Sequence, residues 1–212
     1  MAESTNVELM LRNVRTSYFY GFQPYVSKPD ANGKTNSSYS SHFLLPPDHP
    51  DLPAIRAAIK TVAQGMWKDK AAEMLTGLMG QDRICLHKGD ISKPGEEAYK
   101  GMFYVSAGNG NKRFSIVETR GDQNVALTEA DGRPYSGCFV NAKIAIWAQS
   151  NSWGKRINAQ LQGVQFLRHG EAFGGGKVAR ADEFDKVPVA MDADAPPPAA
   201  TETADPMADL LG

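Results

Sequence analysis

The stretch that decides the fold is Tyr135-Ser-Gly-Cys-Phe-Val-Asn-Ala-Lys-Ile-Ala-Ile-Trp-Ala-Gln149. Because side chains alternate across a β-strand, the even-numbered positions from Cys138 to Ala148, which are all apolar, face a core. The odd-numbered positions face outward and include Phe139, Lys143 and Trp147. An exposed strand face that carries two large rings beside a cation is unfavourable in water unless something covers it. The stretch therefore predicts a central strand with a core face and a binding face.

A second strand is predicted immediately after the first. Residues Arg156–Arg168 again alternate, and the alternation changes parity at Gly163, which predicts a β-bulge there. The short connection Ser150–Gly154 predicts a tight hairpin loop that carries Trp153. The two long strands are therefore expected to pair with each other.

The N-terminal part of the chain predicts two more strands and one helix. Val7–Leu11 alternates, and Tyr39–Leu45 forms a second strand after a turn at Asp30–Gly33. Four apolar residues then recur at spacings of four, three and four, on one face of a helix: Ile55, Ile59, Val62 and Met66. Asp51 favours the start of this helix, and the run ends near Leu78. One long helix among strands argues for a small barrel or sheet with an insertion, and against a doubly wound α/β fold.

Length and composition set the broad class. The chain has 212 residues, 42% of them hydrophobic and 22% charged, which suits one medium-sized domain. The two cysteines, Cys85 and Cys138, are too few for a disulfide framework. No apolar run is long enough for a membrane-spanning helix, and the first residues lack a signal-peptide pattern. These features predict a cytoplasmic protein without a membrane partner.

The net charge of −1 conceals an uneven distribution. Residues 1–180 hold 22 Lys and Arg against 16 Asp and Glu, whereas residues 181–212 hold one base and eight acids. From Val187 onward the chain is rich in Ala, Pro and acids and has no aromatic residue, which predicts a disordered acidic tail at 181–212 behind a folded domain at 1–180. A basic body with an acidic tail is typical of a polyanion-binding chain that regulates this contact. The alternative is an ordinary surface with a solubilising tail.

Aromatic and basic residues occur together in three places. Binding of single-stranded nucleic acid without sequence preference requires cations that follow the phosphates and flat rings on which unpaired bases stack. The three groups are Phe139, Lys143 and Trp147; Trp153, Lys155 and Arg156; and Lys112, Arg113 and Phe114. Ordinary packing explains any one of them, but three groups on a basic body favour nucleic-acid binding. Weaker candidates are Tyr20, Tyr25, Lys28 and Tyr104, whereas Phe19, Phe43 and Phe103 are predicted to lie in the core.

The sequence offers no support for catalysis. The four histidines are isolated and share no metal-ligand spacing with other donors, apart from the short Cys85-Leu86-His87. No phosphate-binding glycine motif is present, and carboxylates are not clustered at a spacing that suggests bound magnesium. We therefore expect no catalytic residue, no metal site and no cofactor.

The chain resembles the phage-encoded single-stranded-DNA-binding proteins with an OB-fold, including a family long known only as a domain of unknown function. The resemblance covers roughly residues 9–176, and its main segments are Tyr39–Pro46, Lys112-Arg113, Tyr135–Cys138 and Gly163–Glu171. It implies a mainly β, five-stranded Greek-key barrel with a helix inserted between strands, which binds DNA along a concave sheet face.

The resemblance also implies roles in DNA replication, recombination or repair. In such proteins a flexible acidic tail contacts replication proteins and competes with DNA for the basic groove. This chain ends Asp209-Leu-Leu-Gly212, without the terminal aromatic residue common in those tails. Duplex DNA binding and a homodimer are left open. The rival interpretation is a structural or protein-interaction module, such as a virion or assembly protein, that uses the same aromatic face.

Overall fold

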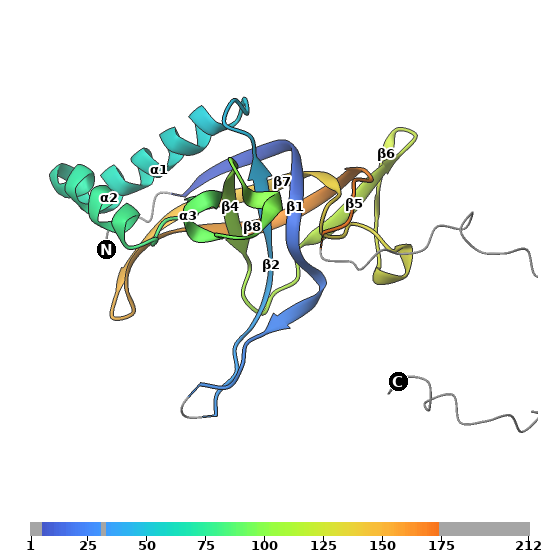
Figure 1. Cartoon of the computed structure of the whole chain (residues 1–212), viewed down its shortest axis with the longest axis horizontal. Helices are drawn as coiled ribbons and strands as arrows, with labels where there is room; N and C mark the ends of the chain where they lie inside the picture. Colours follow the sequence, from blue (N-terminus) through green and yellow to red (C-terminus); the bar gives the residue numbers. More distant parts are fainter. Residues whose placement is uncertain (1–5, 31–32, 174–212) are drawn as a thin grey trace, which may run out of the picture. The chain divides into compact units, whose positions relative to one another are not determined.

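The computed structural model describes residues 6–30 and 33–173 (Figure 1). The strands are β1 (Val7–Val26), β2 (Ser37–Leu45), β3 (Leu86–Lys88), β4 (Phe103–Gly108), β5 (Ser115–Arg120), β6 (Gln123–Ala126), β7 (Phe139–Asn151) and β8 (Gly154–Arg168). The helices are α1 (Leu52–Trp67), α2 (Ala71–Gly80) and α3 (Gly89–Ser92), and 3-10 turns lie at η1 (Lys68–Lys70), η2 (Glu97–Tyr99) and η3 (Glu129–Asp131). The predicted tail and its boundary at residue 180 lie outside the described residues.

Five of the strands close into a barrel. Antiparallel pairing runs from β4 through β2, β1 and β7 to β8, and a short parallel pairing of β4 with β8 closes the ring. In this closing pair Ala107 lies opposite Ala159 and Gly108 opposite Gln160. The strands β5 and β6 extend the sheet beyond β8, and β3 extends it beyond β4. The predicted fold class, a mainly β OB-type barrel with an inserted helix, is confirmed.

The alternation of β7 places its two faces as the sequence predicts. The even-numbered residues from Cys138 to Ala148 are all buried and form much of the barrel core. Phe139, Lys143 and Trp147 on the opposite face are less buried. Ala145 is an exception, because this small residue is buried on the outer face between its long cross-strand neighbours Glu8 and Gln160. Of the predicted core phenylalanines, Phe43 is fully buried, whereas Phe19 and Phe103 are half-buried and pack against the core.

The predicted bulge in β8 is present. Lys143 of β7 pairs with Gly163, but the next residue, Ile144, pairs with Leu161, so that Gln162 is the extra residue of β8. Before the bulge the buried residues of β8 are odd-numbered, and after it Val164 is buried instead. The bulge therefore keeps Gly163 and Gln165 on the outer face, which Arg156, Asn158 and Gln160 occupy before it.

The helical insertion covers one part of the barrel and differs in one detail from its prediction. Ile55, Ile59 and Val62 are buried in α1, which packs against β1 and β7. The predicted single run is interrupted after Trp67, since Lys68 has a φ of 50°, and α2 continues to Gly80. Asp51 lies at the N-cap, but its carboxylate accepts the backbone N–H of Arg12 at 2.7 Å instead of capping the helix.

Candidate nucleic-acid interface

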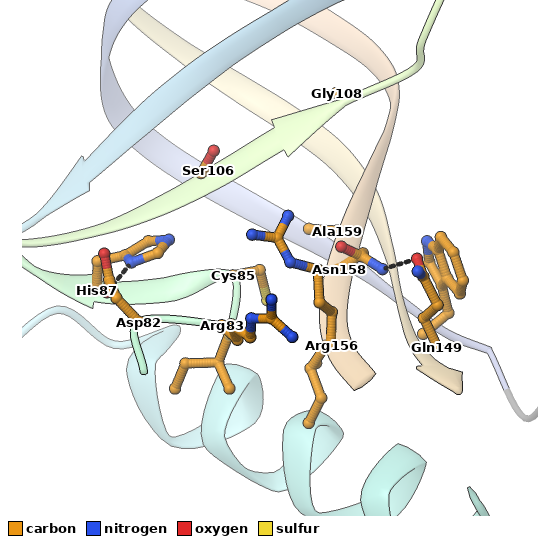
Figure 2. A pocket seen from close by; sticks show the side chains of 13 residues that line it. Asp82, Arg83, Cys85, His87, Ser106, Gly108, Gln149, Arg156, Asn158 and Ala159 are labelled. Atoms are coloured by element: carbon orange, nitrogen blue, oxygen red, sulfur yellow. Dashed lines mark hydrogen bonds and ion pairs between the residues drawn. The ribbon is translucent and has the colours of Figure 1, made fainter. Parts of the chain in front are cut away.

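A groove runs along the outer face of β4 and β8. Its first part is a cavity of about 440 Å³, whose lining includes Ser106 of β4, Trp147 of β7, and Arg156 and Asn158 of β8 (Figure 2). A second cavity, of about 450 Å³, is lined by residues 108–112, Trp147 and Gln160. Gly108 and Trp147 line both cavities, so the two form one continuous depression, which we call the β4–β8 groove.

Two arginines line the first part of this groove. Arg83 enters from the loop after α2, because an isolated parallel bridge pairs Ile84 with Ile157 and the Ile157 N–H donates to the Arg83 carbonyl at 3.1 Å. Arg156 comes from the start of β8, and both side chains are drawn in Figure 2. Among the described residues, neither guanidinium has a hydrogen-bond or ion-pair partner. Two like charges in one cavity repel each other, and a bound anion would relieve the repulsion.

The acidic residue of the same cavity does not neutralise these arginines. Asp82 is instead held by two neighbours: its Oδ1 lies 2.7 Å from His87 Nδ1 and accepts the Ser92 hydroxyl at 3.1 Å. His87 in turn stacks on Tyr104 with ring centroids 4.7 Å apart. The carboxylate is thus tied to the β3 side of the groove, which leaves Arg83 and Arg156 free for a ligand.

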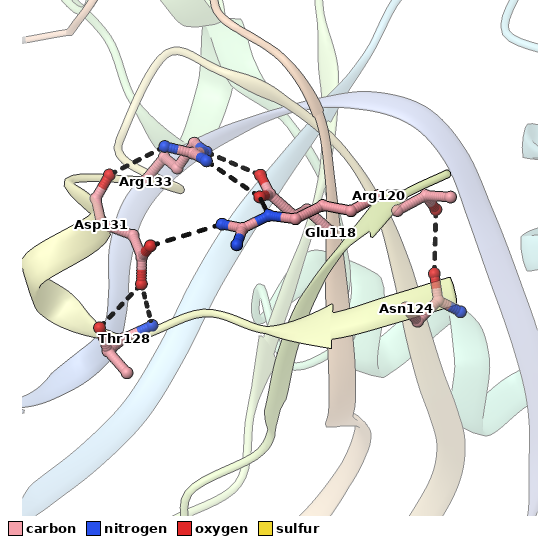
Figure 3. A network of polar contacts seen from close by, with 7 residues as sticks. Glu118, Arg120, Asn124, Thr128, Asp131 and Arg133 are labelled. Atoms are coloured by element: carbon pink, nitrogen blue, oxygen red, sulfur yellow. Dashed lines mark hydrogen bonds and ion pairs between the residues drawn. The ribbon is translucent and has the colours of Figure 1, made fainter. Parts of the chain in front are cut away.

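Two arginines beyond β8 are paired in a way that the groove arginines are not. Beyond β8, Arg133 donates two hydrogen bonds to the Glu118 carboxylate, at 2.8 and 2.9 Å, and Arg120 contacts Glu118 and Asp131 (Figure 3). Hydrogen bonds from Arg133 hold the pKa of Glu118 below its ordinary value. Such a network satisfies its own charges. The contrast distinguishes Arg83 and Arg156 from the two arginines that bind Glu118.

Trp147 and the surrounding amides shape the middle of the groove. Trp147 is half-buried where the two cavities meet. Asn158 donates to Gln149 Oε1 at 3.2 Å, and Gln160 donates to Asn109 Oδ1 at 2.9 Å. These bonds fix the side chains on either side of the indole. The small residues Ser106 and Gly108 leave room opposite it, so an indole faces an open, polar channel.

The β7–β8 turn extends this face of the barrel. Trp153 is 84% exposed at the turn, and its backbone N–H donates to Asn151 Oδ1 at 3.0 Å. Asn151 has the same parity on β7 as Trp147. Lys155 is exposed, and its Nζ lies 3.7 Å from the sulfur of Met74 on α2. Of the second predicted group, Arg156 lines the groove, Trp153 lies at the adjoining turn, and Lys155 contacts Met74 of α2.

Lys112 and Arg113 lie at the other end, beside the long β1–β2 hairpin. Ser37, in the last strand pair before the hairpin turn, is joined to their loop by a Ser37–Asn111 side-chain bond of 2.8 Å. Arg113 donates to the Tyr39 hydroxyl at 3.3 Å, which raises the pKa of its guanidinium. Nearer the barrel on the same hairpin, the Tyr20 and Tyr25 rings lie 5.2 Å apart and Tyr25 is 47% exposed. Lys28 is exposed near the tip of the hairpin.

Phe139 and Lys143 do not join Trp147 in the groove. Eight residues separate Phe139 from Trp147, which is roughly 27 Å along a strand. The Arg168 guanidinium lies 3.4 Å from the Phe139 ring centroid and covers the ring. Lys143 forms an ion pair with Glu8 at 3.0 Å. The three residues share one face of β7, as predicted, but they lie in three different environments.

Comparison with known proteins agrees with this architecture. A family model described as "Enterobacter phage Enc34, ssDNA-binding protein" matches residues 7–195. The chain belongs to this family. A phage relative, "Putative protein p50" of Acyrthosiphon pisum secondary endosymbiont phage 1, is 37% identical over 188 residues, which cover 87% of this chain and 96% of the relative. The family resemblance read from the sequence is thereby confirmed.

Solved structures of this family share the fold. The single-stranded DNA-binding protein from bacteriophage Enc34 in complex with ssDNA is 25% identical, with a TM-score of 0.63, and the match covers 79% of this chain and 89% of that one. A second structure of the Enc34 protein is 24% identical, with a TM-score of 0.60, over 84% of this chain and 90% of that one.

Two residues predicted to contact DNA are buried instead. Tyr104 is 4% exposed, because His42 and His87 stack on it with centroids 4.8 and 4.7 Å away, and Tyr99 packs against its edge. Phe114 is 8% exposed and packs edge-on against Phe19. Neither ring has a free face for a base, so we correct both assignments and leave these residues out of the interface.

Arg83 is the groove residue that the sequence did not reveal. It is close to no aromatic residue in sequence and follows an acid, Asp82, so it does not resemble the three aromatic and basic groups. Only the bridge between Ile84 and Ile157 brings it beside Arg156. Within residues 6–30 and 33–173 there is no group of three His, Cys, Asp or Glu side chains that could hold a metal ion. Over the same ranges, no helix has the length and apolar character needed to cross a membrane.

Proposed function

We propose that this chain is a non-enzymatic protein that binds single-stranded DNA in the β4–β8 groove. The observation that carries the proposal is the pair of unpartnered guanidiniums, Arg83 and Arg156, in one cavity with the Trp147 indole. Phosphate oxygens supply the missing anion, and an unpaired base supplies a flat partner for the indole. Membership of the Enc34 family supports this ligand, since a relative has been solved with ssDNA.

Binding then proceeds through two kinds of contact. Arg83 and Arg156 capture phosphates and release the counterions condensed on the strand, so this contribution weakens as salt rises. A base stacked on Trp147 contributes about 1–3 kcal/mol and requires no particular sequence. Exposed residues extend both ends of the groove: Trp153 and Lys155 at one end, and Lys112 and Arg113 at the other. Tyr20, Tyr25 and Lys28 on the β1–β2 hairpin are more distant candidates.

We further propose that the protein acts on DNA in the cytoplasm of the infected host cell, during phage replication, recombination or repair. In this proposal residues 181–212, with one base and eight acids, compete with DNA for the basic groove and contact replication proteins. The charge of this segment supports the first role, because a net −7 segment is attracted to the same arginines as a phosphate backbone.

Tryptophan fluorescence tests the proposed site directly. The described chain has three indoles, of which Trp67 is half-buried against the core, Trp147 lies in the groove and Trp153 is exposed. Titration with a single-stranded oligonucleotide at low salt should quench the emission, because a stacked base lies against an indole. Trp147→Phe and Trp153→Phe should each remove part of the quenching, whereas Trp67→Phe should not. Absence of both quenching and a mobility shift at low salt would refute the proposal.

A further inference from the structure

A third cavity lies on the outer face of the barrel, beyond the β4–β8 groove. It has a volume of about 180 Å³, and its lining includes Met10 of β1, Ser115 of β5, Lys143 of β7 and Gly163 of β8. Ser115 and Gly163 are the small residues of its lining, and a Cβ at Gly163 would meet only the Ser115 carbonyl oxygen, at 3.4 Å, and the Ser115 Cβ, at 3.8 Å. The absence of a side chain at Gly163 therefore leaves space in this cavity.

The third cavity continues the line of the groove. The same three segments of chain line the second and the third cavities, and each advances by a few residues between them. The second cavity is lined by Trp147 of β7, Gln160 of β8 and Lys112 of the turn before β5. The third is lined by Lys143, Gly163 and Ser115 of the same segments. Three residues of β8 correspond to about 10 Å. The Gln162 bulge lies at this step and keeps Gly163 on the outer face.

The cation at this cavity, Lys143, is ion-paired with Glu8. Lys143 Nζ lies 3.0 Å from Glu8 Oε2, and Gln162 donates to Glu8 Oε1 at 3.0 Å. Both ionic side chains are about half exposed. Exposed pairs of this kind are weak, since water and salt screen them. Because the pair is weak, a phosphate of a DNA strand that is already held in the groove can replace the Glu8 carboxylate on Lys143.

We propose that this third cavity is a second nucleotide subsite, where a DNA phosphate displaces Glu8 from Lys143. The inference rests on the proposed function and extends its footprint. From Arg156 to Gln165 the track follows nine residues of β8, or about 30 Å. A track of this length accommodates several nucleotides, more than the groove alone, within the range of about 4–16 for an OB-fold. Glu8 thus competes for Lys143 with any single-stranded DNA long enough to reach the third cavity.

Oligonucleotide length separates this subsite from the groove. We would measure the affinity of the full-length protein for oligothymidylates of 4 and 12 nucleotides, in the wild type and in Glu8→Gln, Lys143→Gln and the double variant. For the 12-mer, Glu8→Gln should tighten binding by up to about fivefold, because no competing charge remains. Lys143→Gln should weaken it and lower the slope of log affinity against log salt by about 0.7. The double variant should lose the gain of Glu8→Gln, and the 4-mer should respond to none of these changes.

A steric variant provides independent evidence. Gly163→Leu should fill the third cavity and weaken only the 12-mer, whereas Gly163→Ala, whose methyl group makes ordinary contacts, should bind as the wild type does. Unchanged melting temperatures confirm that the variants fold. If the 12-mer responds to Arg156→Gln but to neither Glu8→Gln nor Lys143→Gln, the subsite is refuted while the groove stands. If the wild type binds neither oligonucleotide, the proposed function itself fails.

Discussion

Replacing both groove arginines with glutamine gives the sharpest prediction. Arg83 and Arg156 have no partner among the described residues, so Arg83→Gln/Arg156→Gln removes two charges without breaking an ion pair there. Each arginine that contacts a phosphate adds about 0.7 to the slope of log affinity against log salt for single strands. The slope should therefore fall by about 1.4. Between 50 and 200 mM salt the wild type should lose about sevenfold more affinity than the variant.

Fluorescence anisotropy of a labelled oligonucleotide, measured at five salt concentrations, gives this slope. The matched control is Lys60→Gln/Lys70→Gln, which removes the same charge from exposed positions that do not line the groove. The control should keep the wild-type slope within about 0.3. Melting temperatures of both variants should stay close to that of the wild type, because the loss of exposed charges has little effect on stability.

Equal slopes in the groove variant and the control would refute the reasoning. In that case affinity would depend on the total charge of the body and not on two phosphate contacts in one cavity. A lower affinity with an unchanged slope would also count against phosphate contact, since it would show that the arginines act through packing.

Two further predictions concern the tail and an interior histidine. Truncation after Ala181 should tighten DNA binding at low salt, since it raises the net charge by seven; unchanged affinity in a filter-binding assay would exclude tail competition. Burial, with Lys93 and His87 nearby, lowers the pKa of His42 from 6.5 to about 4, so the stability that depends on neutral His42 is complete above pH 6.5 and declines as the pH falls toward 4. The loss should be about 2 kcal/mol between pH 7 and pH 5 in urea denaturation and much smaller in His42→Asn, and equal losses would contradict this account.

Local periodicity made the barrel strands predictable. The alternation in β7 depends only on which side of a strand each residue occupies, so the core face from Cys138 to Ala148 was evident from the sequence. The same argument located the β8 bulge at Gly163 and the buried face of α1. The interruption at Lys68 was not evident, because the residues on both sides of it favour helix and the break is a backbone feature of one residue with a φ of 50°.

The composition of the site was predicted less completely, because it depends on contacts between distant segments. The sequence made Tyr104 a candidate for stacking on a base. In the structure Tyr99, from the segment 89–102, packs against it. Phe114 follows two exposed cations, but its side chain turns inward to Phe19. Arg83 reaches the groove only through the pairing of Ile84 with Ile157. Neighbours in sequence reveal which chemistry is available, whereas pairings across the barrel decide which side chains meet.

The bulge at Gln162 connects the fold to the proposed footprint. In a regular strand, Gly163 and Gln165 would share the parity of Arg156's buried neighbours Ile157, Ala159 and Leu161, and their side chains would point into the core. One extra residue reverses this parity, so β8 presents outward positions from Arg156 in the groove to Gly163 and Gln165 in the third cavity. The same residue donates to Glu8 and helps to hold the carboxylate beside Lys143. A single inserted residue thus extends the outward-facing positions of β8 and also positions Glu8, the carboxylate that a long single-stranded DNA must displace from Lys143.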